Sequence, residues 1–158
     1  MEMKQHTATA RGTNLGISWK FAVEVAKFIQ GRKLTNAKKI LGEVLEKKTA
    51  VPFTRYNMDL GHKRGPMGPG RYPMKAAEEI LSLLNSAEMN ANNKGLDQDS
   101  LFVLSAMANK GSTQMRAGRH RGRHAKRTHF VVILAEKEKK SAEKKEQNKT
   151  KKGEKKTK

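Results

Sequence analysis

Residues Ser100–Leu134 read SLFVLSAMANKGSTQMRAGRHRGRHAKRTHFVVIL and set the architecture of this 158-residue chain. The stretch opens with the apolar run Ser100–Met107 and closes with Thr128–Leu134, and both runs are rich in β-branched and aromatic residues, which favour strands. Between them, Gly111–Lys126 is polar and has almost nothing apolar to bury. The pattern predicts a long antiparallel hairpin, at about residues 105–130, whose far end leaves the globular part.

The middle of this stretch carries closely spaced cations and no acid. Small residues, glycines and histidines separate Arg116, Arg119, Arg121, Arg123 and Lys126. Such groups repel one another in water unless a polyanion neutralises them. We therefore expect the end of the hairpin to bind nucleic acid, with the rest of the chain as its support.

The chain as a whole is also basic. It has 34 Lys and Arg against 15 Asp and Glu, a net charge of +19, and an isoelectric point near 10.3. Residues 136–158 carry 11 Lys and 5 Glu, so +6 of this charge belongs to that segment and +13 to residues 1–135. A basic body of this kind is typical of a nucleic-acid-binding protein.

An anionic membrane surface is the other partner that such a charge allows. No stretch is apolar enough to span or anchor, and no signal-peptide core follows Met1, so we expect no membrane insertion. Cysteine is absent, which excludes disulfides and thiolate metal sites and fits a reducing cytosol.

The first predicted helix, WKFAVEVAKFIQG, follows Ser18 as its N-cap and ends at Gly31. It is apolar over most of its circumference, with Lys20, Glu24 and Lys27 as a narrow polar stripe, so we expect it at the centre of the core.

Two more amphipathic segments predict helices. One begins at Thr35, runs to about Lys48 and is stopped by Pro52; the other runs from near Pro73 to near Asn92. We assign the methionines along the chain to core filling.

A short strand is expected at Thr7–Leu15, interrupted by Gly12. The predicted fold is α+β: three helices packed on a small antiparallel sheet, with a protruding basic β-hairpin. Residues 1–135 form one domain, and the Lys-rich segment 136–158 is too poor in apolar residues to fold, so we expect a disordered tail.

The loop Val51–Tyr72, VPFTRYNMDLGHKRGPMGPGRY, is long and combines cations, glycines and aromatic rings. Glycines allow close backbone approach and rings offer stacking faces, so its Arg/Gly portion is expected to contact RNA. An alternative for Phe53 and Tyr56 is that they pin the loop to the core.

Catalytic and metal-binding interpretations are weak. His120, His124 and His129 lack a neighbouring Cys or carboxylate, and GPMGPG lacks the Gly-Lys-Ser/Thr of a phosphate loop. Asp97 and Asp99 fit a turn better than a metal site. We expect no enzyme activity, no cofactor, no metal and no small-molecule substrate.

Several blocks then occur in a fixed order: ARGTNLGISWKFAVEVAKFIQGRKL, AVPFTRYN, GHKRG, GPGRYPMKAAEEILSLLNSAEMNANNKGLD and THFVVIL. From about Ala8 to Glu136 the chain resembles the archaeal and eukaryotic branch of the ribosomal protein L22 family, called L17 in eukaryotic naming. The resemblance implies a structural protein of the cytoplasmic ribosome, seated on large-subunit rRNA near the exit of the peptide tunnel. It implies that the hairpin penetrates the rRNA, with its tip at the tunnel wall near the nascent chain, and that neighbouring ribosomal proteins are partners.

The resemblance and the charge pattern together give three groups of candidate RNA-binding residues. The N-terminal group is Arg11, Asn14, Ser18, Trp19 and Lys20. The loop group is Arg55, Tyr56, His62, Lys63, Arg64, Gly68, Gly70, Arg71 and Tyr72. The hairpin group is Met115, Arg116, Arg119, His120, Arg121, Arg123, His124, Lys126 and Arg127.

One departure from the family concerns the return of the hairpin. Arg127 leads directly into Thr128, so we expect a hairpin a few residues shorter than is usual there. The alternative function is a free RNA- or DNA-binding regulator, or an RNA chaperone, that uses the same basic patches. A membrane-surface protein is a third possibility, but the Gly and His content of the arm does not suit an amphipathic helix.

Overall fold

The computed structural model describes residues 7–65 and 67–136. The helices are α1 (Trp19–Ile29), α2 (Leu34–Leu45) and α3 (Met74–Asn93). The strands are β1 (Thr7–Leu15), β2 (Val51–Pro52), β3 (Gly70–Arg71), β4 (Leu101–Lys110), β5 (Gln114–Met115), β6 (His124–Ala125) and β7 (Thr128–Glu136), with a short 3-10 helix, η1 (Gln98–Ser100), before β4. The predicted α+β class is confirmed. The predicted tail starts at Glu136, but this residue is the last of β7 and pairs with Leu101 of β4; residues 137–158 lie outside the described residues.

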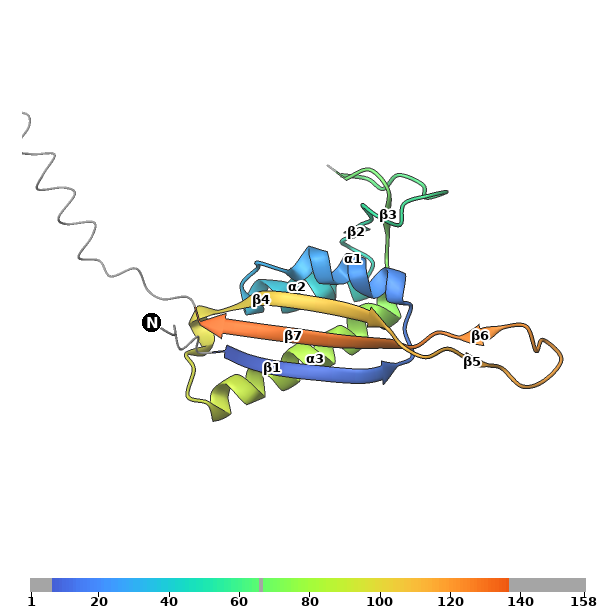
Figure 1. Cartoon of the computed structure of the whole chain (residues 1–158). Coiled ribbons are helices and arrows are strands. Elements are labelled where there is room, and N and C mark those ends of the chain that lie inside the picture. Colours follow the sequence, from blue (N-terminus) through green and yellow to red (C-terminus); the bar gives the residue numbers. More distant parts are fainter. Residues whose placement is uncertain (1–6, 66, 137–158) are drawn as a thin grey trace, which may run out of the picture.

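The main sheet has the order β1–β7–β4, with both pairings antiparallel. Its central strand, β7, pairs Val132 with Ala10 on one side and with Ala106 on the other. The helices pack on one face of this sheet, α3 mainly against β1 and β7, and α1 mainly against β4 (Figure 1). The largest fully buried side chains include Phe130, Ile29, Leu34, Leu41, Ile80, Leu84, Leu101 and Leu134.

The boundaries of α1 agree with the predicted ones, whereas those of α2 differ. Ser18 occupies the N-cap position of α1, without a side-chain capping bond, and Gly31 follows the helix at φ 77°, as predicted. Helix α2 begins at Leu34, before the predicted Thr35, because Lys33 is already paired with Phe102 of β4. It ends at Leu45, well before Pro52, because Lys47 turns the chain at φ 60°.

Two burial predictions are wrong. Glu24, assigned to the polar stripe of α1, is 1% exposed, because the chain after β2 covers it. Core filling does not describe Met58, Met89 or Met115, which are at least 65% exposed.

The predicted hairpin is present. Strands β4 and β7 pair along their length, and the chain continues past Gly111 and Arg127 into the β5–β6 pair, which projects from the end of the sheet (Figure 1). At the exit point the Gly111 N–H donates to the Arg127 carbonyl at 2.9 Å. A Cβ on Gly111 would lie 3.0 Å from the Arg127 carbonyl carbon, so the close approach of the two strands requires glycine.

The base of the hairpin is tied to the body by Thr128. This residue is fully buried, and its hydroxyl donates to the Ile17 carbonyl at 2.9 Å. The bond joins β7 to the segment that enters α1, so the hairpin leaves the body at a fixed place.

Candidate nucleic-acid interface

The side chains of the hairpin end are free of intramolecular partners. Residues 112–124 are all exposed. Within the described part of the chain, no side-chain hydrogen bond or ion pair involves residues 112–126. The cations of this segment are therefore exposed to solvent and not neutralised by an acid of the described residues.

The backbone of the hairpin end is nevertheless ordered. The Arg116 N–H donates to the Arg123 carbonyl at 2.9 Å, and the Arg123 N–H donates to the His120 carbonyl at 3.2 Å. Gly118 has φ 105°, a conformation that other residues rarely adopt. The hairpin end is therefore a narrow two-stranded ribbon with exposed side chains at residues 112–124.

The histidines of this region do not gather. His120 and His124 are exposed, whereas His129 lies in β7 and accepts a hydrogen bond from the Asn14 N–H at its Nδ1, at 3.2 Å. Over residues 7–65 and 67–136 there is no group of three His, Cys, Asp or Glu that could hold a metal ion.

The long loop is organised by Glu24, which the sequence analysis placed on the surface. One carboxylate oxygen accepts the Arg55 N–H at 2.8 Å and the Tyr56 N–H at 3.0 Å. The other accepts the Thr54 N–H at 3.2 Å and the Thr54 hydroxyl at 3.3 Å. A buried carboxylate thus satisfies three consecutive backbone donors and fixes the start of the loop.

The ionisation of Glu24 follows from these contacts. Burial alone would raise its pKa, because the charged form loses water. The bonds from Thr54, Tyr56 and Arg55 outweigh burial and leave the pKa of Glu24 below its ordinary value. The carboxylate is therefore charged at neutral pH.

The aromatic residues of the loop bind it to the body. Phe53 is 2% exposed and meets the Phe21 ring edge-on at 5.4 Å, so the alternative that it pins the loop is confirmed. Tyr56 is half-buried, lies 5.6 Å from the Trp19 ring, and has a buried hydroxyl without a partner among the described residues. Lys20 and Arg55 both lie 5.5 Å from the centre of its ring.

The far end of the loop is exposed and basic. His62, Lys63 and Arg64 are all exposed, and the Lys63 N–H donates to the Gly68 carbonyl at 3.1 Å. Gly70 is buried, and a Cβ there would lie 3.1 Å from the Lys63 side chain and 3.3 Å from the Val51 carbonyl oxygen. Gly70 therefore serves packing inside the loop.

The N-terminal group lies beside the hairpin base. Arg11 and Lys20 are exposed, and Asn14 has φ 59° within β1, where the pairing with β7 shifts register between Gly12 and Leu15. The Trp19 indole N–H donates to the Ala108 carbonyl at 3.0 Å, so its polar atom is already engaged.

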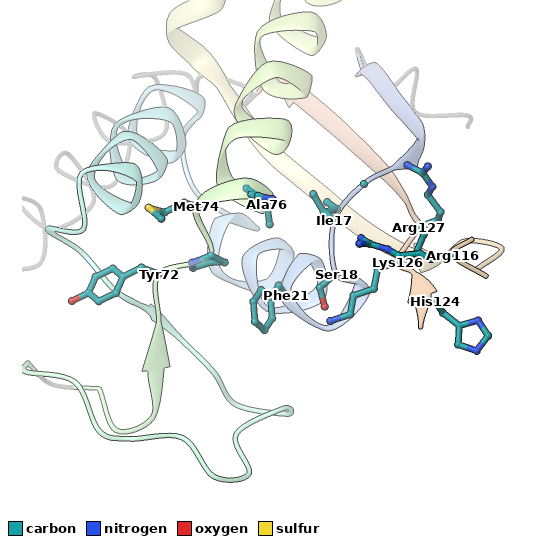
Figure 2. Close-up of a pocket in the computed structure, with 14 residues that line it drawn as sticks. Ile17, Ser18, Phe21, Tyr72, Met74, Ala76, Arg116, His124, Lys126 and Arg127 are labelled. Atoms are coloured by element: carbon teal, nitrogen blue, oxygen red, sulfur yellow. The ribbon is translucent and has the colours of Figure 1, made fainter. Parts of the chain in front are cut away.

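The structure brings part of the three groups together around one cleft of about 580 Å³. The cleft lies between the hairpin base and the first turns of α1 and α3, and Figure 2 shows Arg116 and Lys126 reaching toward Ser18 while His124 points away. Tyr72 lies at the other end of the cleft, with its ring directed outward (Figure 2). The tip of the long loop is not part of this cleft.

Two cations in this region were missing from the sequence-based set. Lys75 lines the large cleft, and Lys110 lines a neighbouring one beside Trp19. Lys75 could have been found, because a cation in the first turn of a helix opposes the helix dipole and is unusual unless an anion compensates it. Lys110 has no comparable signal in the sequence.

The fold and these surfaces define a basic α+β nucleic-acid-binding protein. A family model described as ribosomal protein L22p/L17e matches residues 10–135. The chain belongs to this family, on its archaeal side.

Archaeal relatives agree along most of the chain. The large ribosomal subunit protein uL22 of Thermoplasma volcanium is 45% identical over 111 residues, covering 70% of this chain and 74% of that protein. The protein of the same name from Nanoarchaeum equitans is 41% identical over 139 residues, covering 84% and 80%. That of Methanococcoides burtonii is 45% identical over 105 residues, covering 66% and 70%. The prediction of a non-enzymatic protein agrees with this family. No helix in the described ranges is long and apolar enough to cross a membrane.

Proposed function

We propose that this chain is a structural constituent of the large ribosomal subunit in the cytoplasm, where it binds large-subunit rRNA. The observation that carries the proposal is a hairpin end without acids, fully exposed at residues 112–124, in a chain of the ribosomal protein L22p/L17e family. The function is binding: cations neutralise phosphates and release counterions, so affinity falls as salt rises.

The body and the hairpin end have different roles in this function. The body, residues 7–110 and 128–136, supplies the core and holds the hairpin through Thr128 and Gly111. The hairpin end supplies arginines, whose planar groups bridge phosphate oxygens and stack on exposed bases. Because Glu136 ends β7, we propose residues 1–136 as the ribosomal domain and 137–158 as a charged tail outside it.

The finer placement is that the hairpin runs along or near the peptide exit tunnel. About eight residues on each arm, at roughly 3.3 Å per residue, give a reach of about 26 Å from the body. At that reach the tip, near Arg119–Gly122, would approach the nascent chain, and the body would contact neighbouring ribosomal proteins at the tunnel exit. Because Arg127 leads directly into Thr128, the hairpin reaches less far than one with extra residues between the arginine run and β7.

Sedimentation of ribosomes that carry a tagged copy of the chain tests the proposal. A subunit constituent stays with the large particle through washes at moderate salt, whereas a free RNA- or DNA-binding regulator or RNA chaperone washes off. A cross-linker at Arg121 then tests the tunnel placement: cross-links to a stalled nascent chain support it, and cross-links to rRNA alone contradict it.

A further inference from the structure

We propose that the cleft between the hairpin base and the first turns of α1 and α3 binds one unstacked nucleotide of the large-subunit rRNA. This proposal rests on the proposed function and adds a defined site to it. The cleft measures about 580 Å³, within the range of about 300–1,000 Å³ that small-ligand sites occupy.

The cleft is built for an anion. Four cations line it, Lys75, Arg116, Lys126 and Arg127, and no Asp or Glu is among its described lining residues. Arg116 and Lys126 come from opposite arms of the hairpin and extend toward Ser18 (Figure 2). With no acid nearby to neutralise them, these groups favour a phosphate.

The two helices that end at the cleft add to this field. Neither α1 nor α3 has an acid in its first turn or a side-chain capping bond. Their first-turn N–H groups therefore lack a side-chain acceptor, and the positive ends of both helix dipoles face the same space as the cations.

Apolar side chains also line the cleft. Ile17, Phe21, Pro73 and Met74 line it, and Met74 is 42% exposed although it lies at the start of a helix that is otherwise packed on the sheet. A cleft lined by both cations and apolar side chains matches a phosphate joined to a flat base, and base contacts of this kind are how proteins hold unpaired nucleotides.

A second cleft indicates a strand of RNA instead of a free nucleotide. It measures about 330 Å³, shares Ser18, Lys126 and Arg127 with the first, and adds Trp19 and Lys110. Adjacent basic clefts with common cations suit two successive nucleotides that cross the hairpin base.

The test is the substitution Ser18→Asp. Ser18 is the N-cap of α1 but makes no capping bond, and Asp is a favoured N-cap residue, so the fold should keep its stability. The new carboxylate stands in the cleft and repels a phosphate. The matched control is Thr35→Asp, which makes the same change of charge in the exposed first turn of α2, outside both clefts.

We expect S18D to bind protein-free archaeal large-subunit rRNA about tenfold more weakly than the wild type, while T35D changes little. Chemical footprinting of the same complexes should show protection lost at one or two neighbouring nucleotides in S18D, with the rest of the footprint kept. Equal binding by the two variants, or a footprint weakened evenly, would overturn the nucleotide site.

Two further outcomes separate the proposals. If the wild-type chain fails to bind this rRNA or to join the large particle, the proposed function fails and the site with it. If S18D binds free rRNA normally but is lost from the assembled particle, the cleft holds a protein partner and the nucleotide proposal is wrong.

Discussion

The hairpin end, residues 112–126, and the long loop, residues 53–69, look alike in composition but are held in different ways. Both are rich in glycine and cations and both project from the body (Figure 1). The loop starts on a buried carboxylate, Glu24, that fixes three consecutive N–H groups, and its base is closed by the β2–β3 pair. The hairpin end has no acid, and its side chains make no hydrogen bond among the described residues.

The two regions are ordered by different partners. Glu24 fixes the backbone at the start of the loop, so RNA binding there has little backbone entropy to overcome. The arginines of the hairpin must be ordered by the RNA itself, at a cost of about 0.5–1.5 kcal/mol for each long side chain. The number of charges does not distinguish the loop from the hairpin end, whereas the position of Glu24 does.

The largest effect is expected from replacing Arg119, Arg121 and Arg123 by Ala. Three charge-assisted phosphate contacts at about 1.5 kcal/mol each predict at least a hundredfold weaker rRNA binding at moderate salt. The slope of log K against log salt should fall by about three, and filter binding over a salt series measures both. The melting temperature should stay unchanged, because these side chains are exposed.

The control removes the same charge elsewhere: Lys33, Lys39 and Lys48 to Ala, all exposed and in or beside α2. Equal losses for the two triple variants would mean that total charge, and not the hairpin, determines binding.

A large loss of stability is expected for Glu24→Ala. It leaves three part-buried backbone N–H groups without their acceptor, at up to about 1–3 kcal/mol each, so we expect a loss of about 3 kcal/mol in urea unfolding. Glu24→Gln keeps one acceptor oxygen and should lose less. Glu78→Ala, at an exposed position of α3, is the control and should be nearly neutral. A stable E24A protein would show that the loop does not depend on this carboxylate.

A smaller effect is expected at the hairpin base. Gly111→Ala places a Cβ 3.0 Å from the Arg127 backbone and should cost about 1–3 kcal/mol. Gly122→Ala, in the same hairpin, meets nothing within 4 Å and should be neutral. Thermal unfolding of both variants measures the difference, and equal melting temperatures would contradict the close approach of the strands.

The pH dependence of stability should report Glu24. Its pKa is lower in the folded chain than in the unfolded one, so the unfolded state takes up the proton first as the pH falls. The stabilisation is complete above the ordinary pKa of Glu and is lost as the pH falls from about 5 through the lowered value. Melting curves between pH 3 and 7 should therefore decline less steeply in E24Q than in the wild type. Parallel curves would argue against the lowered pKa.

The smallest effect is expected for Tyr56→Phe. The hydroxyl is buried without a partner among the described residues, so its removal should change stability and rRNA affinity by less than about 0.5 kcal/mol. Tyr56→Ala, by contrast, removes the ring that packs on Trp19 and should release the start of the loop. A large loss of affinity in Y56F would show that RNA binding exposes this hydroxyl.

Elements with a strong local pattern could be predicted from the residues alone. The strand-rich runs on both sides of Gly111–Lys126 gave β4, β7 and the projecting hairpin, because apolar flanks with an acid-free basic middle allow few other arrangements. Residue preferences at helix ends predicted Ser18 before α1 and Gly31 after it, although the Ser18 side chain makes no capping bond, and the ordered sequence blocks indicated the family.

The burial of polar groups, in contrast, could not be predicted without the packing of the elements. A helical projection of α1 places Glu24 beside Lys20 and Lys27, but the orientation of the neighbouring loop turns it into an internal acceptor. In the same way, Lys33 pairs with Phe102 of β4, and α2 begins earlier than predicted. Ser18, Lys75 and Lys126 belong to separate parts of the chain but line one cleft. Local patterns report preferences over a few residues, whereas the partners of a buried charge or a shared cleft are set by packing between distant segments.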